Sequence, residues 1–247
     1  MRLFLVGGSV RDFLMNRTGG QGDIDFAVEA ESFDAMMAGL KSMGLKTWQV
    51  RPEFVTVRGQ IHTRMLAGTF NFHAADIDGV VNADFTLCRA ETMYTDKRHP
   101  DTVTPTTIVD DLKRRDFTMN AIAMNSDGEL LDPFGGDADI KSHTLKTVGL
   151  PRERFTEDPL RILRAMRFHV TLGVFPDEAL KASFDDSSIV DGLGTLPVER
   201  VREELNRALS HSWRKTMLFL MCDHPRLGDA VERWFDNLWL RATTEER

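Results

Sequence analysis

Cysteine and long apolar runs are scarce in this chain. Among its 247 residues there are two cysteines, Cys88 and Cys222. They lie too far apart in sequence to match a zinc ribbon or a disulfide framework, which favours a reducing, cytoplasmic location. The longest apolar stretch near the C-terminus, 217–222, is far too short to cross a bilayer. These scarcities exclude a disulfide-rich secreted module and give no sign of a membrane role.

A complete secretion signal is also missing at the N-terminus. An apolar run follows Arg2, but it stops at Gly7-Gly8, and no small-residue cleavage site comes after it. We therefore interpret residues 2–6 as a first strand. The chain has no internal repeat or low-complexity tract, and 42% of its residues are hydrophobic, which is enough for a substantial core.

Excess positive charge is absent, since the formal net charge is −7. Lys and Arg supply most of the non-specific affinity for nucleic acid, so a protein that coats nucleic acid indiscriminately is excluded. Basic residues nevertheless cluster locally, which leaves room for a basic surface. The clusters are Lys113-Arg114-Arg115, Arg152 with Arg154, Arg161 with Arg164 and Arg167, and Arg200 with Arg202 and Arg207.

Patterns of apolar residues indicate a mixed αβ half followed by a helical half. Ser32 is a plausible N-cap for a helix that runs to Ser42, and the polar segment 95–107 is typical of a mobile loop. After residue 111 a helical pattern carries residues 113–123, and beyond Gly136 almost everything looks helical. The other expected strands are 2–6, 23–28, 54–57, 69–72 and 83–88, and the other expected helices are 9–16, 157–171, 177–184, 197–210 and 213–221.

Two acidic residues in the segment 22–26 carry the strongest chemical signal. Side chains two residues apart on a strand point to the same face, so Asp23 and Asp25 can aim four oxygens at one point. Mg²⁺ prefers such hard oxygen ligands. The pair follows the turn Gly7-Gly8, whose N–H groups and following helix N-terminus can hold phosphates. Each motif alone is more often structural, whereas together they suggest nucleotidyl transfer with Mg²⁺.

Further motifs make the chain resemble the bacterial-type tRNA nucleotidyltransferases, the family of the CCA-adding enzymes and bacterial poly(A) polymerases. The resemblance covers roughly residues 2–210. It implies an α+β fold with a nucleotidyltransferase head of the DNA polymerase β type over residues 1–145, followed by an all-helical neck and partial body over 146–247. The motifs, in order, are Gly7-Gly8-Ser9-Val10-Arg11-Asp12, Asp23-Ile24-Asp25, Arg114-Arg115-Asp116-Phe117-Thr118-Met119-Asn120-Ala121, Asp132-Pro133-Phe134-Gly135-Gly136 and Glu157-Asp158-Pro159-Leu160-Arg161.

The resemblance also implies roles for individual residues. Asp84 takes the family position of a third catalytic carboxylate, beside the metal-binding pair Asp23 and Asp25. Such a set supports two-metal transfer of a nucleotidyl group to an RNA 3′-hydroxyl, with release of pyrophosphate. The positions that contact nucleotide are Gly8, Arg11, Arg115, Asp158, Arg161, Arg164 and Arg167, whereas Asp12, Arg114 and Asn120 are expected to support the fold.

Asp158 and Arg161 are the residues expected to select the base. Asp accepts from an exocyclic amine and Arg donates in a planar fork, a pair that complements cytosine and adenine rather than uracil or guanine. The alternative is an ordinary helix-face salt bridge. On the family's pattern, the protein adds C and A from CTP and ATP to the 3′ end of tRNA, at the acceptor stem.

Three functions stay open on the sequence alone. The first is CCA addition, and the second is a CC-adding, A-adding or poly(A)-adding relative with the same chemistry. The third is a catalytically silent RNA-binding protein on the same scaffold. The chain ends soon after 196–204, which resembles the family's last motif, so most of the body and the tail look absent. We then expect recognition confined to the acceptor stem, unless a homo-oligomer supplies further surface.

Overall fold

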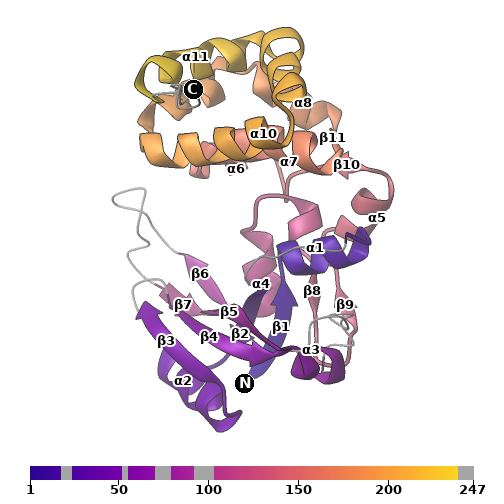
Figure 1. Ribbon diagram of the computed structural model, residues 1–247, viewed down its shortest axis with the longest axis vertical. Helices are drawn as coiled ribbons and strands as arrows, with labels where there is room; N and C mark the ends of the chain where they lie inside the picture. The colour runs from indigo at the N-terminus through magenta and orange to yellow at the C-terminus, as the bar shows by residue number, and fades with distance from the viewer. Residues whose placement is uncertain (18–23, 52–54, 70–78, 92–102, 239–247) are drawn as a thin grey trace, which may run out of the picture. The chain divides into compact units, whose positions relative to one another are not determined.

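The computed structural model describes residues 1–17, 24–51, 55–69, 79–91 and 103–238. The chain packs as two compact units, Met1–Ser142 and His143–Arg247, which we call the sheet unit and the helical unit (Figure 1). The predicted α+β class is confirmed, because a mixed sheet with helices precedes a mostly helical part. The assignment of catalysis to residues 1–145 and of nucleotide selection to 146–247 stays a prediction. No helix in the described ranges is long and apolar enough to cross a membrane.

A seven-stranded mixed sheet organises the sheet unit. Its strands are β1 (Arg2–Val6), β2 (Ile24–Glu29), β3 (Lys46–Arg51), β4 (Thr56–His62), β5 (Val80–Leu87), β8 (Ala123–Met124) and β9 (Leu130–Leu131). The order is β3-β4-β5-β2-β1-β8-β9; β2 and β5 run parallel, and the other neighbours are antiparallel. A separate ribbon pairs β6 (Arg89–Glu91) with β7 (Val103–Pro105).

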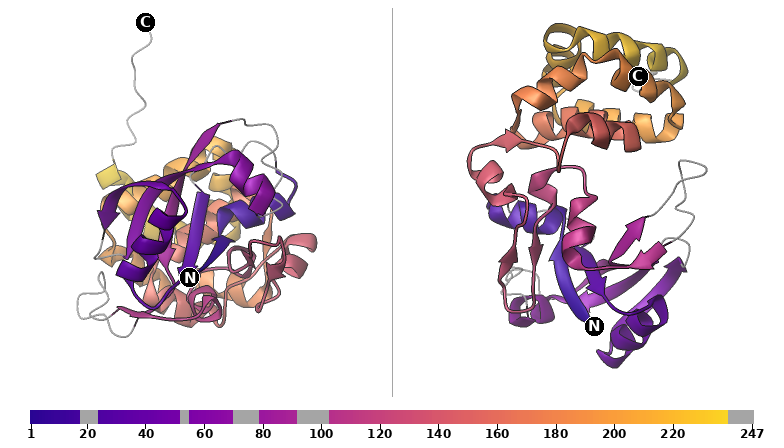
Figure 2. Two further views of the ribbon diagram at one scale, coloured as in Figure 1. Left: turned by 90° about the horizontal axis from the view of Figure 1, so that it is seen from below. Right: turned by 180° about the vertical axis from the view of Figure 1, so that it is seen from behind.

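The helices of the sheet unit flank these strands. They are α1 (Gly8–Leu14), α2 (Phe33–Ser42), α3 (Thr63–Thr69), α4 (Ile108–Lys113), the 3₁₀ helix η2 (Thr118–Asn120) and α5 (Gly136–Lys141). α1 and α4 contact β2, and α2 lies beside β3 in Figure 1 and in the right-hand view of Figure 2. Ser32 caps α2 as expected, since its Oγ accepts from the backbone N–H of Ala35 at 3.1 Å.

Alternation along the central strands separates an apolar face of the sheet from a polar one. Phe26 on β2 and Phe85 on β5 are buried, and their rings stack with centroids 5.1 Å apart. Because successive side chains on a strand point to opposite faces, the preceding residues Asp25 and Asp84 project from the other face. The same alternation that builds the core therefore presents these two acids away from it.

The helix expected through residues 113–123 is wrong. α4 ends at Lys113, and the chain continues as η2 and then β8. The Asp116 carboxylate accepts from the backbone N–H of Phe117 and from Nδ2 of Asn120, which favours a turn over a continued helix. Residues 116–124 are all buried. Their apolar residues mark burial on every side rather than one face of a helix.

Three other expected segments differ in part. The strand expected at 54–57 starts later, at Thr56, because Val55 has a positive φ of 44° and lies in a turn. Of the strand expected at 69–72, Thr69 ends α3 and the rest lies outside the described residues. Of the loop expected over 95–107, residues 103–105 form β7 and residues 95–102 lie outside the described residues.

The motif 132–136 turns the chain into α5 and fastens it to η2. The two carboxylate oxygens of Asp132 accept from the backbone N–H groups of Gly136 at 2.8 Å and of Asp137 at 2.9 Å. A Cβ built on Gly136 would lie 2.2 Å from the carbonyl oxygen of Thr118. Only glycine fits so close an approach of two backbone segments.

We expect Gly136→Ala to lower the free energy of unfolding by about 2–4 kcal/mol, because the backbone of η2 must move away. Gly79→Ala is the matched control in the same unit, since a Cβ there would meet no atom of the described residues within 4 Å. Urea unfolding of both variants measures the difference. Equal stability of the two variants would contradict the close packing of Gly136.

The helical unit is built mainly around α7 and α10. Its helices are α6 (Pro151–Glu157), α7 (Leu160–Leu172), α8 (Glu178–Phe184), α9 (Ser187–Val190), the 3₁₀ helix η3 (Asp191–Thr195), α10 (Val198–Leu218), the π-helix η4 (Phe219–Asp223) and α11 (Pro225–Leu238). β10 (Thr144–Leu145) pairs in parallel with β11 (Phe175–Pro176). α7 packs along α10. The break expected between 210 and 213 is confirmed, because Ser212 leaves helical geometry within α10. The helices α6 and α11 lie in the part that was expected to be almost entirely helical, although neither was expected as a separate helix.

Candidate active site

The turn between β1 and α1 places a glycine against two charged side chains. Gly7 has a positive φ of 70°, a conformation that favours glycine. A Cβ built on Gly7 would lie 3.2 Å from Nη1 of Arg115 and 3.7 Å from Oδ2 of Asp25. Gly8 follows as the first residue of α1. The turn therefore lies beside the guanidinium group of Arg115 and the carboxylate of Asp25, which come from two distant segments of the sheet unit.

Asp25 and Asp84 lie side by side on the polar face of the sheet. They are register partners across the parallel strands β2 and β5, so their side chains project from the same face. Asp25 is exposed and Asp84 is half-buried. The remaining predicted carboxylate, Asp23, lies outside the described residues. The sheet thus brings together two of the three predicted catalytic acids, and their catalytic role stays a prediction.

Arg58 on β4 continues this row on the other side of Asp84. The two residues are register partners across antiparallel strands. Nε and Nη2 of Arg58 donate to Oδ1 and Oδ2 of Asp84 at 2.8 and 2.9 Å, a two-pronged ion pair. The sequence reasoning missed Arg58. Polar residues alternating along 56–60 could have placed it on the polar face, but the register opposite Asp84 is a property of the folded sheet.

The two acids fit a divalent cation. Carboxylate oxygens are the hard ligands that Mg²⁺ prefers, and Mg²⁺ is commonly held by one or two carboxylates together with substrate phosphates. Among the residues that the structure describes, no group of three or more His, Cys, Asp or Glu could hold a metal ion. A fuller ligand set would therefore draw on Asp23 or on oxygens of the substrate.

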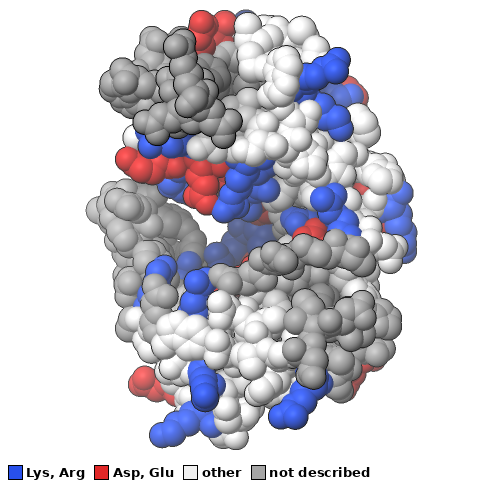
Figure 3. Space-filling view, in the orientation of Figure 1, with Lys and Arg blue, Asp and Glu red and all other residues white. Residues whose placement is uncertain are grey.

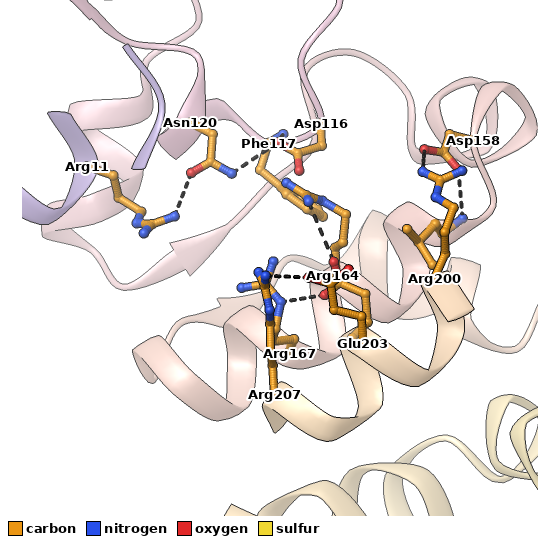
Figure 4. A network of polar contacts seen from close by, with 12 residues as sticks. Arg11, Asp116, Phe117, Asn120, Asp158, Arg164, Arg167, Arg200, Glu203 and Arg207 are labelled. Atoms are coloured by element: carbon orange, nitrogen blue, oxygen red, sulfur yellow. Dashed lines mark hydrogen bonds and ion pairs between the residues drawn. The ribbon is translucent and has the colours of Figure 1, made fainter. Parts of the chain in front are cut away.

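A chain of buried polar contacts joins α1 to η2 (Figure 4). Nη1 of Arg11 donates to Oδ1 of Asn120 at 2.9 Å, and Nδ2 of Asn120 donates to Oδ1 of Asp116 at 3.0 Å. Nε of Arg11 donates to Oδ1 of Asp12 at 2.9 Å. Arg11, Asp116 and Asn120 are all buried. Asn120 therefore supports the fold, while the nucleotide contact expected of Arg11 stays a prediction.

Asp111 on α4 binds both arginines of the neighbouring basic cluster. Its Oδ1 accepts from Nη2 of Arg114 at 2.8 Å, and its Oδ2 accepts from Nη2 of Arg115 at 3.2 Å. The Asp111 side chain is 2% exposed. Burial alone would raise the pKa of Asp111, but the guanidinium groups of Arg115 and Arg114 outweigh burial and lower that pKa. The charged Asp111 thus helps to hold Arg115 beside Gly7.

We expect Asp111→Asn to lower the free energy of unfolding at neutral pH by about 1–3 kcal/mol, because an amide cannot pair with two guanidinium groups. The folded-state pKa of Asp111 is lowered. Its stabilising contribution is therefore present above the unfolded-state pKa and is lost as the pH falls through the folded-state pKa. Urea unfolding across this acidic range should show the gap between wild type and variant closing. A gap that stays constant would contradict the ion-pair assignment.

Asp158 and Arg161 lie at the start of α7, and each has a partner within the helical unit; Figure 4 shows the contact between Asp158 and Arg200. Oδ1 of Asp158 accepts from the backbone N–H of Leu160 at 3.1 Å, and Oδ2 accepts from Nη2 of Arg200 at 3.0 Å. Nη1 of Arg161 donates to Oε2 of Glu157 at 2.9 Å. Asp158 therefore links the first residue of α7 to α10, and its expected reading of a base stays a prediction.

Arg164 and Arg167 follow on α7 and share one acid of α10. Nε of Arg167 donates to Oε2 of Glu204, and Nη1 of Arg164 lies 3.6 Å from Oε1. The Arg167 and Glu204 side chains are 11% and 7% exposed, whereas that of Arg164 is 34% exposed. Adjacent acidic and basic side chains on this unit are visible in the upper part of Figure 3. Arg164 is the more accessible to a ligand, and nucleotide contact stays a prediction for both arginines.

Sequence comparison places the chain among known proteins. The family model described as "Poly A polymerase head domain" matches residues 3–146. The curated CCA-adding enzyme of Geobacillus sp. (strain WCH70) is 35% identical over 221 residues, which is 89% of this chain and 48% of that protein. The chain thus spans about half the length of the curated relatives that it matches.

Solved structures show the same likeness. The CCA-adding enzyme of Bacillus stearothermophilus in complex with CTP aligns with a TM-score of 0.70 and 29% identity, covering 98% of this chain and 55% of that one. A tRNA nucleotidyltransferase complexed with a primer tRNA and an incoming ATP analogue aligns with a TM-score of 0.65 and 25% identity, covering 97% and 59%. These matches confirm the resemblance drawn from the motifs: the chain belongs to the family of the poly(A) polymerase head domain and the CCA-adding enzymes, with a nucleotidyltransferase head of the polymerase β type.

Proposed function

We propose that the chain carries the catalytic head of a tRNA nucleotidyltransferase that adds C and A residues from CTP and ATP to the 3′ end of tRNA. One observation carries the proposal: Asp25 and Asp84 share a sheet face, and Asp25 and Arg115 flank Gly7. Transfer of a nucleotidyl group needs carboxylates for metal ions next to a place for the triphosphate. In the sheet unit, Asp25 and Asp84 would supply the carboxylates, and the Gly7 turn beside Arg115 would supply the place for the triphosphate.

The substrates are proposed from the relatives. One solved neighbour is described as a complex with CTP, and another as a complex with a primer tRNA and an incoming ATP analogue. We assign the same substrates to this chain, with the acceptor stem as the part of the tRNA that it holds. These substrates are present in the cytoplasm, which is the location that we propose.

Mg²⁺ is the cation that we propose for the acids of the sheet face. Asp25 and Asp84 would hold it, together with Asp23. When bound, the metal supplies activation of the attacking 3′-hydroxyl and stabilises the charge of the leaving pyrophosphate. The protein's part is to fix the acids in register, which the parallel pairing of β2 with β5 does.

Arg115 is proposed to bind the triphosphate. Asp111 holds one end of its guanidinium group, while Nη1 lies against the Gly7 turn. Nε of Arg115 is buried and has no hydrogen-bond partner among the described residues. Buried donors in native proteins are normally satisfied, so an oxygen of a bound ligand is a natural acceptor here. Gly7 and Gly8 have no side chains to block an approach to their backbone N–H groups.

Choice of nucleotide is assigned to the helical unit. Asp158 and Arg161 would exchange their contacts with Arg200 and Glu157 for the edge of an incoming cytosine or adenine. An acid that accepts from an amine and a guanidinium that donates to a ring nitrogen accept both bases and refuse uracil and guanine. Arg164, which is partly exposed on the same helix, is proposed as a further nucleotide contact.

Incorporation assays test the proposal directly. The protein is incubated with each labelled triphosphate and with tRNA transcripts that lack CCA, end in C, end in CC or are complete. Stepwise addition of C, C and A that stops at CCA supports the proposal. Addition of only CC, only A or a long A tail would identify the other members of the family, and tRNA binding without incorporation would identify a silent RNA-binding protein.

A further inference from the structure

Three charged residues form one row across three strands of the sheet unit. Arg58 on β4 is the register partner of Asp84 on β5, and Asp84 is the register partner of Asp25 on β2. One guanidinium group and two carboxylates therefore lie at a single level of the sheet, on the face opposite the stacked Phe26 and Phe85.

The rows on either side of this level carry no charge on β4 and β5. Oγ1 of Thr56 and Oγ1 of Thr86 are 3.0 Å apart, and Nε2 of Gln60 donates to Oδ1 of Asn82 at 3.5 Å. Neutral cross-strand pairs thus suffice to hold these strands together on this face. Among these three rows, β4 carries a charged residue only in the row of the two carboxylates, where that residue is Arg58.

Arg58 forms an ion pair with Asp84 and binds both oxygens of its carboxylate. Each of its two donating nitrogens takes one oxygen of the carboxylate, and the two side chains are 34% and 27% exposed. Two neighbouring carboxylates repel each other, and a guanidinium group, which stays charged at every physiological pH, offsets this repulsion when no metal is bound. The same fixed charge repels a divalent cation.

We propose that Arg58 is a counter-ion built into the metal site, a positioning residue that neutralises Asp84 in the metal-free protein and weakens the site's affinity for a divalent cation. The inference rests on the proposed function, because that function makes Asp25 and Asp84 metal ligands. Its consequence is that the affinities for metal and for triphosphate are coupled. Beside Arg58 the metal ion binds weakly by itself, and it binds more tightly when a triphosphate is also bound, because the phosphate oxygens supply the missing negative charge.

Metal binding without nucleotide tests the inference. Mn²⁺ is titrated into wild type, Arg58→Met and Arg58→Lys, and free Mn²⁺ is measured by electron paramagnetic resonance. Arg58→Met is expected to bind Mn²⁺ on the order of tenfold more tightly at low salt, since a unit charge next to a divalent ion is removed. Arg58→Lys keeps the charge and is expected to stay within about threefold of wild type.

Lys141→Met is the matched control. It removes one positive charge from the same unit, at an exposed pair in which Nζ of Lys141 lies 2.6 Å from Oδ2 of Asp137. Its Mn²⁺ affinity is expected to equal that of wild type. Asp84→Asn combined with Arg58→Met should lose the gain, because the acid that Arg58 neutralises is gone.

Thermal unfolding gives a second readout. Arg58→Met should unfold at a lower temperature than wild type in a chelator, and Mg²⁺ should raise its unfolding temperature by more than it raises that of wild type. Arg58→Gln serves in the same measurements if Arg58→Met does not fold.

Mn²⁺ affinity that is unchanged or weaker in the neutral variant would overturn the inference, and Arg58 would then only support Asp84 as its cross-strand partner. Neither readout requires nucleotidyl transfer. Tighter Mn²⁺ binding by Arg58→Met in a protein that extends no RNA would defeat the proposed function alone. Wild-type Mn²⁺ binding by Arg58→Met in a protein that does extend tRNA would defeat the inference alone.

Discussion

Asp25→Ala is expected to abolish incorporation of both CTP and ATP, with a rate loss on the order of 10³-fold or more. Asp25 is exposed on the polar face of the sheet and flanks the Gly7 turn. Its removal takes away oxygens that a metal ion needs and leaves the stacked core of Phe26 and Phe85 in place. Single-turnover incorporation of labelled CTP and ATP measures the loss.

The fold should survive this change, since no buried group is lost with Asp25. Circular dichroism and urea unfolding should give nearly wild-type curves. Asp127→Ala is the matched control, because Asp127 is an exposed acid of the same unit in the turn between β8 and β9, and it should keep full activity. Asp84→Ala is expected to lose activity severely as well. Substantial turnover by Asp25→Ala would remove Asp25 from the metal site.

Asp158→Asn is expected to relax the choice among the four triphosphates, lowering discrimination against UTP and GTP by about 10²-fold or more. A site that hydrogen-bonds a base edge rejects the wrong base because its own polar groups are left unpaired. Asn keeps the oxygen that can accept from the backbone N–H of Leu160, so this contact at the start of α7 should be kept. Arg161→Ala should have a similar effect. The measurement is kcat/KM for each triphosphate on one tRNA transcript.

Arg200→Met separates base reading from helix support. Nη2 of Arg200 binds Oδ2 of Asp158, so a purely structural Asp158 would predict the same loss from either change. We expect Arg200→Met to keep the preference for CTP and ATP, while Asp158→Asn loses it. An Asp158→Asn variant that stayed fully active and still refused UTP and GTP would show that Asp158 only joins α7 to α10.

Local features of the chain were predictable because their physical causes are local. Ser32 caps α2 through a hydrogen bond to a backbone N–H three residues further along the chain. The helical period of the apolar residues in α7 predicts most of that helix without knowledge of its packing partners. The motifs could also be recognised in the sequence, since glycine turns and paired acids need particular residues at particular spacings. They identified the family, most of the candidate residues and the order of the two parts.

The failure at residues 113–123 has its cause in tertiary burial. The segment 113–123 reads as a helix because its apolar residues are dense, yet residues 116–124 are buried on all sides and their backbone is held by Asp116. Periodicity reports one buried face and loses its meaning where every face is buried. Gly136 also depends on tertiary packing. Glycine is required there because a Cβ would collide with the backbone of Thr118, a residue on another segment.

The sequence by itself determined the chemistry that the chain offers: the acids, the glycine turn and the arginines, each fixed by residue type and short spacing. Only the tertiary structure decided which of these groups meet. Arg58 reaches Asp84 across 26 residues and Arg11 reaches Asn120 across 109, and such pairs depend on strand register and packing. Register is set by the sum of many weak contacts over the whole sheet, so no single motif can encode it.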